Sequence, residues 1–135
     1  MTLVRTVLDY GNLVVEAGNI ETFTYTPTAA GTLKKGSILA RDTTTNKLVD
    51  YVKGGTTAGN GVPLTVVTSD VTITAADVTA TQKDIRGLTH ATVRQDRLVI
   101  IADGDASNVD HVELDGLRHV GIDVMKVTDQ SVLDN

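Results

Sequence analysis

The sequence predicts a small, mainly β domain. This prediction rests on the amino-acid composition and on the alternation of residue types along the chain. Threonine makes up roughly one residue in six, and threonine and valine both favour strands over helices. Aromatic residues are only 3% of the chain, with no tryptophan and a single phenylalanine. The core must therefore consist of Val, Leu, Ile and Ala, and the 135 residues suit one domain of modest size.

The charge balance and the residue counts exclude several classes of function. The net charge is −5, which argues against nucleic acid as a partner because phosphate contacts need a basic surface. The absence of cysteine excludes disulfides and thiolate chemistry, and it fits assembly in a reducing cytoplasm. No apolar run approaches the ~20 residues of a membrane span, and the N-terminus is a poor signal peptide.

The N-terminal segment, residues 1–26, forms a distinct region. Alternation over residues 21–26 is typical of a strand, with Glu21, Phe23 and Tyr25 on one face and threonines on the other. Glycines and asparagines interrupt the stretch before it. Two interpretations stay open: an extended arm that orders on a partner, or the first strand of the domain.

The middle of the chain is a succession of strand patterns. Residues 37–52, "SILARDTTTNKLVDYV", predict a β-hairpin around a polar turn. A glycine-rich loop covers 53–61, and strand resumes over 62–74, where an early proline suggests an edge or first-residue position. Residues 75–88 are ambiguous between a helical turn and strand or loop. Alternation over 89–102 predicts another strand.

The clearest helix pattern comes near the end of the chain. Ser107 is a candidate N-cap, with Asp110 three residues later in a box-like arrangement. Apolar residues then recur at helical spacing, and Gly121 stands where a helix would end. Residues 122–127 predict a final strand.

No constellation in the chain indicates an enzyme. Asp103, Asp105 and Ser107 alternate as oxygen ligands do at the start of a calcium loop. However, Asn108 stands where the sharp-turn glycine belongs and Leu114 replaces the bidentate carboxylate, so a solvated turn before a helix is the better interpretation.

The sequence also gives no support for a metal site, a catalytic serine or a phosphate-binding loop. His111 and His119 are eight residues apart, whereas zinc ligands on a helix prefer a separation of four. No serine lies in a glycine-flanked elbow, and the loop at 53–61 lacks the Gly-Lys-Ser/Thr of a phosphate loop. We therefore expect no enzymatic activity, no cofactor and no metal.

The order of the segments resembles the bacteriophage lambda head decoration protein family. The resemblance rests on "NLVVEAGNIETFTYTPTAAGTLKKGSILA", on "KLV" in the hairpin and on "LRHVGI" near the end. It covers most of the chain, from about Tyr10 to Met125. The chain departs from the family in a longer, more charged segment at 81–106 and in a tail after Met125.

The resemblance implies a β-clip-type, barrel-like domain with one short C-terminal helix and an extended N-terminal arm. It implies a homotrimer at local threefold positions on the outer surface of an expanded capsid, made in the host cytoplasm, that stabilises the head against the pressure of its DNA. Residues 1–26 would be the capsid-binding arm and 27–135 the decoration domain. The arm would add a strand to the major capsid protein through Leu13, Val14, Val15, Ile20, Thr22 and Phe23.

Two other function classes remain. A small β-rich module could bind carbohydrate or another surface on a virion, although sugar sites usually stack on aromatic rings and few are available. A hydrolase would need a measurable activity that depends on Asp103, Asp105 or His111. Neither nucleic acid nor a membrane is expected as a partner.

Overall fold

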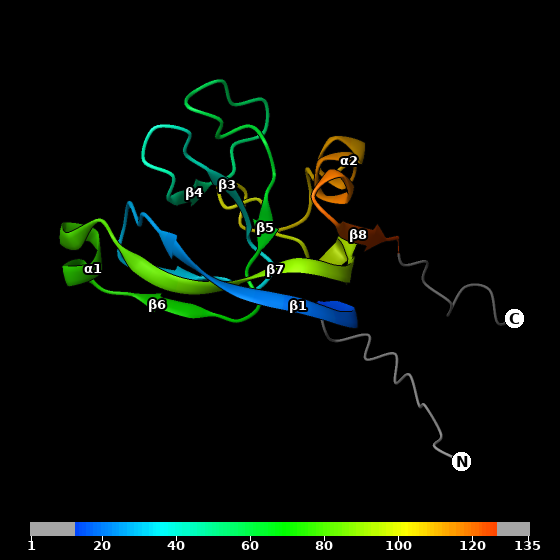
Figure 1. The fold of residues 1–135 in the computed structure, drawn as a ribbon, viewed down its shortest axis with the longest axis horizontal. Coiled ribbons are helices and arrows are strands. Elements are labelled where there is room, and N and C mark those ends of the chain that lie inside the picture. Colours follow the sequence, from blue (N-terminus) through cyan, green and yellow to red (C-terminus); the bar gives the residue numbers. More distant parts are fainter. Residues whose placement is uncertain (1–12, 127–135) are drawn as a thin grey trace, which may run out of the picture.

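The computed structural model describes residues 13–126, and these contain eight strands and two short α-helices (Figure 1). The predicted mainly β fold is confirmed. The elements follow in the order β1 (Val14–Tyr25), β2 (Gly31–Leu33), β3 (Ile38–Arg41), β4 (Leu48–Asp50), β5 (Thr65–Val66), β6 (Val71–Ile73), α1 (Ala75–Ala80), β7 (Lys83–Arg94), α2 (His111–His119) and β8 (Ile122–Met125).

Six strands form one strongly curved sheet in the order β5-β3-β4-β1-β7-β8. The long strands β1 and β7 run antiparallel along nearly their whole length (Figure 1). The sheet also curls back on itself, because Val67, the residue after β5, bridges to Gly87 of β7 and the Thr68 amide donates to the Arg86 carbonyl over 3.2 Å. The result is a barrel-like arrangement, with β2 and β6 as a separate two-stranded sheet.

Strand β3 separates two hydrophobic cores, since its residues alternate between its two faces. Ile38 and Ala40 belong to the larger core, together with α2, β8 and the second half of β7. Leu39 belongs to the smaller core, which Tyr25 and Ile85 help to build. Burial on both faces explains why "SILA" is a continuous apolar run rather than an alternating one.

The predicted hairpin is confirmed, whereas the strand expected over 62–74 is interrupted. β3 and β4 pair antiparallel, with Ala40 opposite Val49. The chain from 62 to 74 instead divides into β5, which pairs with β3, and β6, which pairs with β2 in the other sheet. A bend between them is held by the Asp70 carboxylate, which accepts a 2.7 Å hydrogen bond from the Lys35 amide.

The ambiguous segment 75–88 contains both a helix and a strand. Thr74 caps α1 in a reciprocal capping box with Asp77, which outweighs the low helix propensity of the threonine and valine that follow. The helix ends at Thr81, whose φ of 53° is left-handed. Strand β7 then begins at Lys83 and ends at Arg94, earlier at both ends than the strand predicted over 89–102.

The C-terminal helix is confirmed, but its predicted N-cap is wrong. Asp110, not Ser107, caps α2, because its carboxylate accepts the Val112 amide over 2.9 Å while Glu113 accepts the Asp110 amide over 3.0 Å. Ser107 belongs to the preceding turn, where its amide donates to Asp105. Gly121 ends the helix with a φ of +97°, as expected, and β8 supplies the predicted final strand.

Residues 14–25 form the first strand of the domain, which is one of the two interpretations of the N-terminal region. These residues form β1 inside the six-stranded sheet, and the side chains of Leu13 and Tyr25 are 1% and 4% exposed. Both cores draw on residues before position 26, since Leu13 belongs to the larger core and Tyr25 to the smaller one. The start of the expected arm, residues 1–12, lies outside the described part of the chain.

Candidate docking edge on strand β1

The residues expected to contact the capsid divide into two groups in the structure. Leu13 is buried in the larger core and Val14 packs against that core, so both support the fold. The side chain of Val15 lies outside what the structure describes. Phe23 is half-buried against the smaller core, and the guanidinium carbon of Arg41 lies 5.9 Å from the centre of its ring.

Ile20 and Thr22 are the two expected contact residues that face solvent. Ile20 is 54% exposed, which is unusual for a large apolar residue within a strand. Both lie in the regular part of β1, after the irregular pairings between Val14 and Ile20. Their positions opposite Leu88 and Arg86 place them beside the middle of β7.

The backbone of this segment also faces outward. The Thr26 amide donates to the Leu48 carbonyl over 2.8 Å, on the side of β1 away from β7. Alternate residues of a strand direct their N–H and C=O groups to the same side, so Thr22 and Ile20 direct theirs to that side too. β4 reaches β1 only at Tyr25, and within residues 13–126 no other strand pairs with this edge.

The edge of the sheet at β8 is protected differently. β8 is only four residues long, and the Arg118 side chain from α2 donates to the Val124 carbonyl over 3.0 Å and pairs with Asp123. Short strands and charged side chains are usual ways of blunting a sheet edge. The Ile20–Thr22 edge lies in a twelve-residue strand and carries one charged side chain, Glu21, so its length makes it the better template for an added strand.

Local hydrogen bonds account for the polar motifs of the sequence. Hydrogen bonds from the side chain and from the amide of Ser107 hold the pKa of Asp105 below its usual range, and Asp103 accepts from Asn108 over 3.0 Å. His90 Nδ1 lies 3.1 Å from the Gly121 carbonyl. Across the described chain, no three His, Cys, Asp or Glu side chains gather as metal ligands do.

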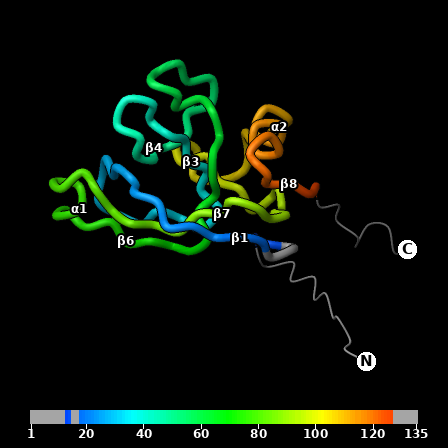
Figure 2. Tube along the Cα trace, viewed as in Figure 1, coloured from blue at the N-terminus to red at the C-terminus, as the bar shows by residue number. Residues whose placement is uncertain are grey.

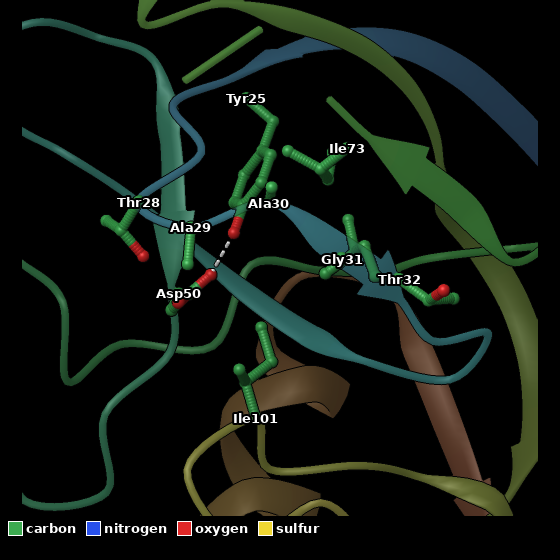
Figure 3. A pocket seen from close by; sticks show the side chains of 10 residues that line it. Tyr25, Thr28, Ala29, Ala30, Gly31, Thr32, Asp50, Ile73 and Ile101 are labelled. Carbon is green, nitrogen blue, oxygen red and sulfur yellow. Dashed lines mark hydrogen bonds between the residues drawn. The ribbon is translucent and has the colours of Figure 1, made fainter. Parts of the chain in front are cut away.

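A polar pair that no sequence pattern indicated lies beside a surface cavity of about 180 Å³ (Figure 3). The Tyr25 hydroxyl donates to Asp50 at the cavity wall, which Ile73 and Ile101 also line. Burial raises the pKa of both groups, so each favours its neutral form more than it would in water. The pair joins the end of β1 to the end of β4.

A second unforeseen cluster fastens α2 to the hairpin. Glu113 is fully buried, and its carboxylate accepts hydrogen bonds from Tyr51, Lys53 and the Asp110 amide. Lys53 also forms a 2.9 Å ion pair with Asp110. The capping pattern Asp-x-x-Glu was visible in the sequence, but its partners in the distant hairpin segment were not.

Comparisons with known proteins add no family assignment. No family model matches the chain, and no curated protein sequence matches it. No helix within residues 13–126 is long and apolar enough to cross a membrane.

Proposed function

We propose that the protein is a capsid decoration protein that adds its β1 edge to a strand of a phage major capsid protein. The observation that carries this proposal is the open edge at Ile20 and Thr22, where an exposed apolar side chain accompanies outward-facing backbone groups. The resemblance of the sequence to the bacteriophage lambda head decoration proteins supports the same function. In this arrangement the strand keeps its place in the domain while its free edge pairs with the capsid.

The proposed contact uses fewer residues of the chain than the resemblance implied. Leu13 and Val14 serve the core, and Phe23 packs inward, so Ile20 and Thr22 remain as contacts together with residues 1–12. Val15, whose side chain lies outside what the structure describes, stays a predicted contact. One short added strand gives modest affinity because ordering the partner costs conformational entropy. Three edges on one trimer would raise the overall affinity through effective concentration.

Three exposed valines form a candidate surface for self-association. Val52, Val62 and Val112 are 42%, 62% and 43% exposed. They belong to the 52–63 loop and to the first turn of α2, which both lie in the upper half of Figure 2. Lys53 of the loop forms an ion pair with Asp110 at the start of α2. We propose that these side chains contribute to the homotrimer.

A carbohydrate-binding module is the weaker alternative. Within residues 13–126, Tyr25 and Tyr51 are buried and Phe23 is half-buried, so no described aromatic ring lies open on the surface to stack on a sugar.

Co-sedimentation with expanded shells tests the proposal. The shells are assembled from the major capsid protein encoded in the same genome, and the variant is the double substitution Ile20→Lys and Thr22→Lys. Lysines on an edge strand oppose pairing, so we expect apparent affinity to fall at least about tenfold, which corresponds to roughly 1.4 kcal/mol.

The control variant is Ala76→Lys, which adds a charge at an exposed position of α1 away from the edge. Its binding should equal that of the unaltered protein. Equal binding of the edge variant, or no binding by the unaltered protein, would refute the proposal. A deletion of residues 1–26 is unsuitable as a test, because it removes a strand and two core residues.

A further inference from the structure

The cavity beside Tyr25 and Asp50 is small and has both polar and apolar walls. Its volume of about 180 Å³ lies below the roughly 300–1,000 Å³ of pockets for drug-sized ligands, so it suits a group about the size of one side chain. Residues 28–32 form part of the wall next to the tyrosine–aspartate pair (Figure 3). The larger apolar side chains of the wall are Leu33, Ile73 and Ile101.

Asp50 contributes a carboxyl group to this wall without a cation beside it. Of the described residues that line the cavity, none is a lysine, arginine or histidine, and no ion pair within residues 13–126 includes Asp50. Burial raises the pKa of Asp50, although the hydrogen bond from Tyr25 opposes that shift. A carboxylate withdrawn from water is costly without a counter-charge, so the cavity favours a cationic ligand.

The cluster around Glu113 shows how the same molecule completes a tyrosine–carboxylate pair. The Tyr51 hydroxyl donates to Oε2 of Glu113, as the Tyr25 hydroxyl donates to Oδ1 of Asp50. The ammonium nitrogen of Lys53 lies 3.2 Å from the other oxygen of Glu113, Oε1. In the described part of the chain, no ammonium lies at Oδ2 of Asp50, and the cavity lies beside this carboxylate instead. The two pairs therefore differ by one ammonium group.

We propose that the cavity binds a primary alkylammonium group, with the nitrogen at Oδ2 of Asp50 and the carbon chain against the apolar side chains of the wall. An ammonium has three donors, and the Thr28 hydroxyl, which also lines the cavity, is a further acceptor (Figure 3). Burial of the carbon chain adds a favourable hydrophobic contribution. Such a group ends a lysine side chain of another protein chain, and it also occurs in free aliphatic amines.

Titration of the full-length, isotope-labelled protein with n-butylammonium chloride tests the proposal. The amide chemical shifts of residues 28–33 report on binding, and sodium chloride keeps the ionic strength constant. We expect saturable binding with a Kd of about 1–10 mM, because so small a ligand has few atoms to contribute. The control ligand is n-butanol, which has the same carbon chain without the charge and should bind at least about ten times more weakly.

The matched variants are Asp50→Asn and Asp115→Asn. Asp50→Asn keeps an acceptor for the Tyr25 hydroxyl but removes the charge, so n-butylammonium should bind at least about ten times more weakly. Asp115→Asn makes the same change at an exposed carboxylate of α2 that does not line the cavity, and binding should stay as in the unaltered protein. Unchanged binding by Asp50→Asn, or equal binding of n-butanol and n-butylammonium, would overturn the proposal.

The unaltered protein gives a second readout that needs no substitution. Its affinity for n-butylammonium should fall as the pH is lowered from about 7 to about 4, because protonation removes the charge of Asp50. Tyr25 is the other titratable side chain described in the wall, and it stays protonated over this range because burial raises its pKa. An affinity that does not change with pH would contradict the proposal.

A blocked lysine, Nα-acetyl-lysine methylamide, distinguishes the two sources of the ammonium group. Binding as tight as that of n-butylammonium supports a lysine of a protein partner, whereas binding of n-butylammonium alone supports a free amine. The inference does not depend on capsid binding, because it involves neither Ile20 nor Thr22.

Discussion

The hydroxyl of Tyr51 donates a 2.5 Å hydrogen bond to Oε2 of Glu113, a carboxylate that is fully withdrawn from solvent. Oε1 of the same carboxylate accepts from Lys53 over 3.2 Å and from the Asp110 amide over 3.0 Å. A buried charge is tolerated only when it is paired and hydrogen-bonded, and here every oxygen has a donor. The cluster joins α2 to the hairpin that carries β4.

Removing the hydroxyl of Tyr51 should destabilise the domain. In Tyr51→Phe, Oε2 of Glu113 loses its donor while staying buried, and we expect the free energy of unfolding to fall by about 1–3 kcal/mol in urea titrations. The control is Asp115→Ala, which alters an exposed carboxylate on the same helix and should change stability by less than about 0.5 kcal/mol. Similar values for the two variants would show that the hydrogen bond contributes nothing.

The ion pair of Asp110 predicts a dependence of stability on pH. Hydrogen bonds from Lys53 and from the Val112 amide hold the pKa of Asp110 below its usual range. A lowered pKa in the folded state contributes stability above the unfolded value, about 3.9. This contribution is lost as the pH falls through the folded value.

Asp110→Asn keeps an N-capping side chain but removes the titrating group. We expect the stability advantage of the unaltered protein over this variant to be largest near neutral pH and to shrink as the pH falls below about 4. Urea unfolding from pH 7 down to about 2.5 measures the difference. Parallel stability curves for the two proteins would contradict the assignment.

A close approach at Gly87 predicts a steric effect of adding a methyl group. A Cβ there would lie 2.4 Å from Oγ1 of Thr65, which is buried and donates to the Leu88 carbonyl over 2.7 Å, and 3.1 Å from the Phe23 ring. Gly87→Ala should therefore destabilise the domain by roughly 1–3 kcal/mol.

Thr65→Ala removes the atom that Gly87→Ala would meet. The destabilisation by Gly87→Ala should accordingly be smaller in the Thr65→Ala background, and a double-mutant cycle measured by urea unfolding isolates that coupling. Strictly additive effects would show that Thr65 is not the source of the strain.

The protection of β8 by Arg118 predicts a change in solubility. Arg118→Ala frees the Val124 carbonyl and leaves the β8 edge without its cover, so we expect more self-association at high protein concentration. Arg86→Ala, which removes an equal charge from an exposed position of β7, is the control. Light scattering at matched concentrations compares them, and equal scattering would mean that Arg118 does not guard the edge.

Local signals in the sequence determined much of the secondary structure. The polar turn between "SILA" and "LVDYV" specified the β3–β4 hairpin, and Gly121 marked the end of α2, because turns and caps depend on neighbouring residues alone. The dominance of threonine and valine over aromatic residues likewise determined the mainly β fold. The α2 N-cap was predicted at Ser107 rather than Asp110, because both residues suit a cap and only the Glu113 carboxylate selects between them.

Tertiary structure alone decided the role of residues 14–25 and the position of the open edge. Alternation in "ETFTYT" indicates a strand but carries no information about its neighbours. β7, which comes much later in the chain, pairs with one side of β1, while β4 reaches the other side only at Tyr25. Contacts between distant segments decide which backbone groups of β1 stay unpaired. The sequence therefore determined that residues 21–26 favour a strand, whereas the fold determined which edge of that strand is free.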